Sequence, residues 1–123
     1  MAGGAVEAPA VTAYSIVLVT IGSADEGERI AAALVGEELA ACVNVIGPIR
    51  SIYRWEGQVQ RDEEVLLVIK TRTALVGAVE LRVRTLHSYQ TPEIIAVPIV
   101  AGSAPYLDWL ARATRGPEMN EDS

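Results

Sequence analysis

The sequence predicts an α+β fold, and two observations support this prediction. Short β-rich runs alternate with stretches whose apolar residues recur at steps of three and four, the spacing of an amphipathic helix. Half of the 123 residues are apolar, which is enough for one domain with its own core. We therefore expect a single folded domain over 14–115, with disordered tails at 1–13 and 116–123.

The first strand and the first helix are predicted from the residues at their boundary. Tyr14 to Ile21 is a β-rich run that ends at Gly22. Ser23 and Glu26 form a capping box, in which the Ser oxygen accepts a hydrogen bond from the N3 amide and the Glu carboxylate bonds the cap amide. The apolar spacing that follows predicts a helix over 24–40.

A long hairpin is predicted next, with its turn at Glu56-Gly57. Its first strand begins at Cys42 and runs to Trp55, and its second strand covers 58–71. Gly47-Pro48 interrupts the first strand, because Pro cannot donate to a sheet ladder and Gly weakens a strand. We expect a bulge or bend at this point.

The remaining elements complete the order. Thr73 is the expected cap of a second helix, whose apolar stripe ends at Leu86. Ile94 to Val100 reads as a fourth strand that lies partly at a sheet edge because of Pro98. Ser103 caps a last helix. The order is βαββαβ plus a C-terminal helix, which is typical of a ferredoxin-like sandwich.

Both faces of the predicted sheet are apolar. The two main helices of this architecture cover the same face, so the other face should be polar if it met water. An apolar face left wet would forgo roughly 25 cal/mol per Å² and would invite aggregation. We therefore expect self-association. The apolar pairs that point to opposite faces include Ile16 and Val17, Leu66 and Leu67, Val68 and Ile69, and Ile94 and Ile95.

Composition excludes several classes of partner. The net charge is −6, yet between Tyr14 and Arg115 twelve acids face ten bases, so no basic face for nucleic acid is expected. The lone Cys42 excludes an intramolecular disulfide and fits a reducing compartment. The apolar run at 16–21 is too short for a membrane span, and the N-terminus lacks the basic start of a signal peptide. We expect a cytosolic protein.

Five segments carry a family resemblance: LAACVN at 39–44, SIYRWEG at 51–57, EVLLVIKTR at 64–72, TPEIIAVPI at 91–99 and YLDWL at 106–110. In these segments and their order the chain resembles the CutA family of divalent-cation tolerance proteins. The resemblance implies a homotrimer similar to the PII signalling proteins and a link to copper and other divalent metal ions, with no settled reaction. The family often has His-Pro-Tyr where this chain has His87-Ser88-Tyr89, and the thiol that some members carry after the first strand is missing.

Cys42 and His87 are the candidate metal ligands, because soft metals prefer thiolate and imidazole. The topology places them at opposite ends of the sheet, so one subunit could not join them in a closed site, although copies in a trimer could. No cofactor is certain beyond the copper or other divalent ion that the resemblance implies. His87 is also expected as a hydrogen-bonding residue of a loop or interface, and Cys42 as a small buried residue.

Two clusters are candidate ligand sites. Lys70 and Arg72 share a strand face near Cys42, which suggests an anion pocket, or else strand-end cations that cap the sheet or pair with acids. The other cluster joins Tyr89, Glu93 and His87 to the helix start at Ser23, where free amides favour an anion or a carboxylate. The first cluster therefore consists of Cys42, Lys70 and Arg72, and the second of Ser23, His87, Tyr89 and Glu93.

Aromatic residues mark the expected trimer interface. Tyr53 and Trp55 share one face of the hairpin, and Trp109 lies beside Tyr106 on the last helix, where it is expected to pack on a neighbouring subunit or on the hairpin. Paired aromatics on such a sheet also occur in RNA-recognition modules, but the basic motif of those modules is missing. With one histidine and no local nucleophile–base pair, an enzyme is the minority interpretation. We expect a homotrimer for metal-ion response or small-ligand sensing, or else a structural or partner-docking trimer.

Overall fold

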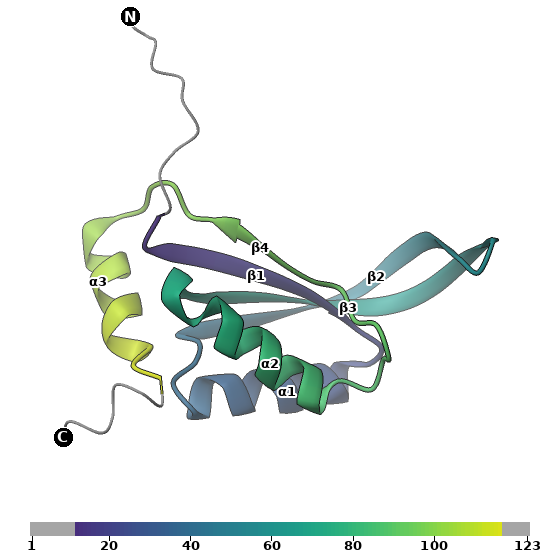
Figure 1. Ribbon diagram of the computed structural model, residues 1–123, viewed down its shortest axis with the longest axis horizontal. Helices are drawn as coiled ribbons and strands as arrows, with labels where there is room; N and C mark the ends of the chain where they lie inside the picture. Colours follow the sequence, from purple (N-terminus) through teal and green to yellow (C-terminus); the bar gives the residue numbers. More distant parts are fainter. Residues whose placement is uncertain (1–11, 117–123) are drawn as a thin grey trace, which may run out of the picture.

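The computed structural model describes residues 12–116, and the tails predicted at 1–13 and 116–123 lie almost wholly outside this range. The described chain has four antiparallel strands and three α-helices, in the predicted order (Figure 1). The elements are β1 (Tyr14–Ile21), α1 (Ala24–Gly36), β2 (Cys42–Trp55), β3 (Gln58–Arg72), a 3-10 turn (Thr73–Leu75), α2 (Val76–Leu86), β4 (Ile94–Pro98) and α3 (Ala104–Ala113).

The sheet has the strand order β2-β3-β1-β4, so β4 lies at an edge as predicted. β4 ends at Pro98 rather than at the predicted Val100. One further backbone bond follows it, from the amide of Ile99 to the carbonyl of Tyr14 at 2.9 Å, and β1 offers no residue beyond this point for pairing. Val100 is 71% exposed, in keeping with the end of the strand.

The core lies between one face of the sheet and the helices α1 and α2, which cover the same side (Figure 1). Alternate residues of β1 and β3 point into it, because successive side chains of a strand point to opposite faces. The fully buried members from these strands are Val17, Val19, Ile21, Leu67 and Ile69, and the helices add Ile30, Leu34, Val79 and Val83.

The opposite face of the sheet, which we call the outer face, remains largely uncovered within one chain. It carries Ile46, Ile95 and Val97 at 45%, 50% and 41% exposure. α3 lies at one end of the sheet and contacts β3, so it covers only a part of this face (Figure 1). The predicted two-faced apolar sheet is therefore present.

Two predicted helix boundaries are wrong. α1 ends at Gly36 and not at Ala40, because Glu38 adopts a positive φ of 61° and the amide of Leu39 bonds back to the carbonyl of Leu34. Thr73 does not cap the second helix: its hydroxyl bonds the hydroxyl of Ser15 at 2.7 Å, and a 3-10 turn precedes α2. Ser103 caps α3 as predicted, by accepting from the amide of Tyr106.

The predicted hairpin extends well beyond the rest of the sheet. β1 pairs with β3 only as far as Val65, so 49–55 and 58–64 form a two-stranded arm (Figure 1). The register shifts where the arm begins: Ile46 pairs with Leu66, whereas Ile49 pairs with Glu64. β2 therefore carries one extra residue at Gly47-Pro48, and the predicted bulge is confirmed.

Candidate functional site

His87 anchors the loop that follows α2. Its side chain is fully buried, and its Nε2 lies 2.8 Å from the carbonyl oxygen of Thr20, which can only accept. The backbone amide of Tyr89 donates to Nδ1 at 3.0 Å. These two bonds fit the tautomer with its proton at Nε2, so both nitrogen atoms are engaged, and Nδ1 also lies 3.7 Å from Glu26 Oε2. The hydrogen-bonding role expected for His87 is present, and the arrangement does not fit the alternative role of metal ligand.

Glu26 holds the same loop from the side of α1. Its carboxylate accepts from the amide of Ser88 at 2.8 Å and from the Ser88 hydroxyl at 3.1 Å. The capping box is therefore only half formed: the amide of Glu26 donates to Ser23 at 3.2 Å, but the carboxylate bonds Ser88 instead of the cap amide. A proline at position 88 would lack this amide donor, so the departure from the His-Pro-Tyr pattern has a structural use.

Tyr89 connects the loop to β3. Its ring lies against the ring of His87, with a centroid distance of 4.7 Å, and its hydroxyl donates to Glu64 Oε2 at 2.8 Å. Burial and this hydrogen bond both raise the pKa of Tyr89 well above the usual range. Glu64 is itself only 7% exposed. The sequence did not single out Glu64, since nothing local distinguishes it from the two acids before it, Asp62 and Glu63.

A pocket of about 430 Å³ opens where the arm meets this loop, and we call it the arm pocket. It brings two predicted ligand residues, Tyr89 and Glu93, together with two predicted interface residues, Tyr53 and Trp55. The hydroxyl of Tyr53 donates to Asp62, and this bond raises the pKa of Tyr53. The lining consists of Thr20, Tyr53, Trp55, Asp62, Glu64, Tyr89, Gln90, Thr91 and Glu93.

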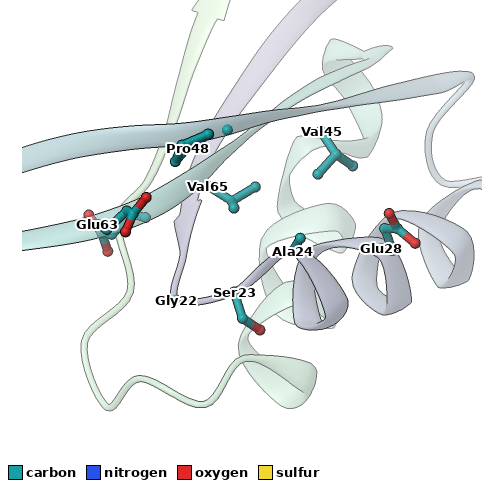
Figure 2. A pocket seen from close by; sticks show the side chains of 10 residues that line it. Gly22, Ser23, Ala24, Glu28, Val45, Pro48, Glu63 and Val65 are labelled. Carbon is teal, nitrogen blue, oxygen red and sulfur yellow. The ribbon is translucent and has the colours of Figure 1, made fainter.

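Ser23 lines a different pocket, of about 540 Å³, between the start of α1 and the bulge (Figure 2). Its hydroxyl already accepts from the amide of Glu26. Glu28, Glu63 and Glu64 also line this pocket, and three carboxylates oppose the binding of an anion. The predicted union of Ser23 with Tyr89 and Glu93 in one anion site is therefore not what the structure shows.

The opposite end of the sheet holds the other predicted cluster. Cys42 and Lys70 are register partners, as expected, and the Lys70 ammonium donates to the side chain of Asn44. The Arg72 guanidinium donates to the carbonyl of Thr114 at 2.6 and 2.9 Å, so it satisfies a backbone oxygen at the end of α3. Within one chain, the strand-end alternative describes Arg72 better than an anion pocket does.

α3 places its aromatic pair at this same end. Tyr106 and Trp109 lie with ring centroids 5.4 Å apart and are 42% and 39% exposed. Burial and the neighbouring Cys42 raise the pKa of Tyr106. The arm projects from the other end of the sheet, so Trp109 cannot pack on the arm of its own chain (Figure 1). Packing of Trp109 on the arm of the same chain is therefore ruled out, and its packing on a neighbouring subunit stays a prediction.

Cys42 and His87 are separated as predicted. Cys42 pairs with Lys70 and thereby lies level with Ile16, whereas His87 contacts Thr20, about 13 Å further along β1. Residues 12–116 contain no group of three or more His, Cys, Asp or Glu side chains that could hold a metal ion. The described residues of a single chain therefore do not fit a closed site for a divalent ion.

The family follows from the match of residues 15–113 to the model described as CutA1 divalent ion tolerance protein. The chain belongs to the CutA1 family. It is 45% identical over 115 residues to "Protein CutA 1, chloroplastic" of Oryza sativa subsp. japonica, a match that covers 93% of this chain and 65% of that protein. It is 48% identical over 99 residues to "Divalent-cation tolerance protein CutA" of Thermus thermophilus, covering 80% of this chain and 96% of the relative.

The fold agrees with solved CutA1 structures. The divalent cation tolerance protein from Thermus thermophilus superposes with a TM-score of 0.81 at 48% identity, covering 82% of this chain and 98% of that chain. CutA1 from Oryza sativa superposes with a TM-score of 0.82 at 45% identity, covering 85% of this chain and 96% of that chain. The chain spans 65% of the length of the rice CutA relative, so the activity of that whole protein is a matter of proposal for this chain.

Proposed function

We propose that this CutA1 chain is a ferredoxin-like subunit of a cytosolic homotrimer that takes part in the response to copper and other divalent metal ions, or in small-ligand sensing, without catalysing a reaction. The observation that carries the proposal is the uncovered outer face of the sheet. Ile46, Ile95 and Val97 are each at least 41% exposed there. Copies of the chain would remove this face from water.

The two ends of the molecule support a ring of copies. The arm carries Tyr53 and Trp55 at one end, and α3 carries Tyr106 and Trp109 at the other. An arm that reaches the α3 end of the next copy makes a head-to-tail contact, and such contacts close into rings when the rotation fits. β2 and β4 are both sheet edges, so the assembly would also shield exposed strand edges.

A metal response would draw on ligands from more than one copy. Cys42 is half-buried and is the sole thiol of the chain, whereas both ring nitrogens of His87 are engaged inside the subunit. A soft ion such as Cu(I) binds thiolates, and copies related by a threefold axis can present one Cys42 each. The proposal therefore assigns copper affinity to Cys42 and not to His87.

Two measurements test this function. Light scattering at low micromolar concentration should give a mass near three times the 13.1 kDa subunit. Calorimetric titration with Cu(II), Cu(I) and Zn(II), beside ATP and phosphate, should show saturable metal binding that Cys42→Ser removes and that a folded His87 variant retains. A mass near one subunit contradicts the assembly, and no saturable binding of any of these ligands contradicts metal response and ligand sensing.

The alternative is a structural or partner-docking trimer whose link to metals is indirect. It is favoured by one observation: residues 12–116 of a single chain hold no cluster of three metal-ligating side chains. A trimeric mass combined with no ligand binding in the titrations would select this alternative.

A further inference from the structure

We propose that the arm pocket binds a small organic cation of the alkylammonium class. The pocket combines three aromatic side chains with three carboxylates at the base of the arm. None of the residues that line it is basic. This site is separate from Cys42, so the inference stands apart from the metal response proposed above.

The carboxylates set the sign of the ligand charge. Asp62, Glu64 and Glu93 all line the pocket, and Glu64 is only 7% exposed. Within the described residues Glu64 has no ion-pair partner, and its one hydrogen bond, from Tyr89, uses a single oxygen. The other oxygen of Glu64 still reaches solvent, since Glu38 Oε1 is the one buried side-chain nitrogen or oxygen atom without a hydrogen-bond partner among residues 12–116. The second oxygen of Glu64 can therefore accept from a cationic ligand that enters the pocket.

The aromatic side chains favour an organic cation. Tyr53, Trp55 and Tyr89 are 41%, 49% and 38% exposed within one chain, so in that chain each ring has uncovered surface; in the proposed trimer Tyr53 and Trp55 are interface residues, and the ligand would bind beside the neighbouring copy. Both tyrosine hydroxyls already donate to carboxylates, to Asp62 and to Glu64. The ring faces attract ammonium groups through their quadrupoles, and Trp does so most strongly.

Size and ligand count argue against an inorganic ion in this pocket. A volume of about 430 Å³ lies in the range of small-molecule sites and far exceeds that of a single ion. Divalent Ca²⁺ and Mg²⁺ need about six or more oxygen ligands in a close shell. Although three carboxylates line the pocket, residues 12–116 contain no group of three or more His, Cys, Asp or Glu side chains that could hold a metal ion. A carbon-bearing cation uses the carboxylates and the rings together.

The test is calorimetric titration of the full chain, in its native assembly, with n-butylammonium and tetramethylammonium. Neutral n-butanol and anionic butyrate serve as ligands of matched size. We expect saturable binding of the two cations and much weaker binding of butanol and butyrate. Trp109→Phe leaves Trp55 as the sole indole, so its fluorescence should respond to the same cations with the same midpoint.

Matched variants locate the site. Glu64→Gln should weaken cation binding at least about tenfold, because a charged partner is replaced by a neutral one. Glu63→Gln removes the same charge one residue away, outside the arm pocket, and should change binding by less than about twofold. Should Glu64→Gln fail to fold, Trp55→Leu removes the largest ring and keeps the carboxylate, and it too should weaken binding.

Three outcomes would overturn the inference. They are no saturable cation binding up to about 10 mM, equal binding of butanol and butylammonium, and a folded Glu64→Gln or Trp55→Leu variant that binds as tightly as the original chain. None of these outcomes depends on the mass or the metal titrations, so the metal-response proposal can fail or succeed independently.

Discussion

The imidazole of His87 donates to the carbonyl oxygen of Thr20 across 2.8 Å and thereby fixes the loop after α2 to the end of β1. Because the other ring nitrogen accepts a hydrogen bond from the amide of Tyr89, the ring also fixes the position of the Tyr89 backbone. Tyr89 then reaches Glu64 on β3. One buried ring thus determines the position of a wall of the arm pocket.

His87→Ala should lower the free energy of unfolding by about 2–4 kcal/mol, because it leaves a cavity and two unpaired backbone groups. Urea unfolding at one fixed protein concentration measures the change. His87→Gln, which keeps a donor, should lose less. The result that speaks against this role is an unchanged stability together with a loss of copper affinity, which would make His87 a metal ligand after all.

Ile95→Lys should disrupt the assembly. Ile95 is half-exposed in one chain, so in a monomer the substitution should stay within about 0.5 kcal/mol. If copies cover the outer face, the new charge is buried and the free energy of unfolding should fall by at least about 2 kcal/mol. Light scattering and urea unfolding report both effects.

The control for this substitution is Leu81→Lys on α2, at a leucine that is 67% exposed. It should leave the mass and the stability unchanged. Equal and small effects of both substitutions would show that the outer face is open to water in solution.

Gly47→Ala should destabilise the chain by about 1–3 kcal/mol. A methyl group at this position would lie 2.9 Å from Cγ2 of Val65, a stiff and buried side chain that cannot move away. Gly77→Ala in α2 meets no atom within 4 Å and should raise stability by about 0.5–1 kcal/mol through helix propensity. Thermal unfolding compares the two; a neutral Gly47→Ala would show that β2 and β3 can separate at the bulge.

Tyr89→Phe should weaken the loss of stability at alkaline pH. The pKa of Tyr89 is raised above its ordinary value of about 10 by burial and by Glu64, so the folded state favours the neutral phenol. Tyr89 therefore makes its full contribution to the free energy of unfolding below about pH 10, and this contribution is lost as the pH rises above that value. Urea unfolding at about pH 9 and about pH 11 should therefore show a smaller fall for the variant.

Some fall will remain in this variant, because the pKa of Tyr53 and of Tyr106 is raised as well. A fall as steep as in the original chain would mean that Tyr89 ionises in the folded state as easily as in the unfolded one.

The class and order of the elements could be predicted from the sequence because periodicity and caps are local signals. The S-x-x-E motif located the start of α1, and Gly47-Pro48 located the bulge. The end of α1 was missed because Leu39 and Ala40 are buried like helix residues although the chain has already turned. Thr73 was misread because a hydroxyl that can cap a helix can also bond another strand, here at Ser15.

The site was predictable only in part. The sequence placed Cys42 beside Lys70 and far from His87, since strand pairing follows from the topology. It could not place Tyr53 and Trp55 in the same pocket as Tyr89, because that contact depends on the loop after α2 reaching the base of the arm. Glu26 and Glu64 were missed as partners of this loop for the same reason.

The extra residue at the bulge has a consequence for the whole arm. Before the bulge, even-numbered residues of β2 pair with even-numbered residues of β3, as Ile46 does with Leu66. After the bulge, odd-numbered residues of β2 pair with even-numbered residues of β3, as Ile49 does with Glu64. Trp55 thereby pairs with Gln58 and shares the face of Glu64. Deleting one residue at the bulge would restore the original parity and rotate the aromatic pair to the reverse side of the ribbon. The arm pocket thus depends on one extra residue in β2, which comes before Tyr53 and Trp55, the two β2 residues that line the pocket.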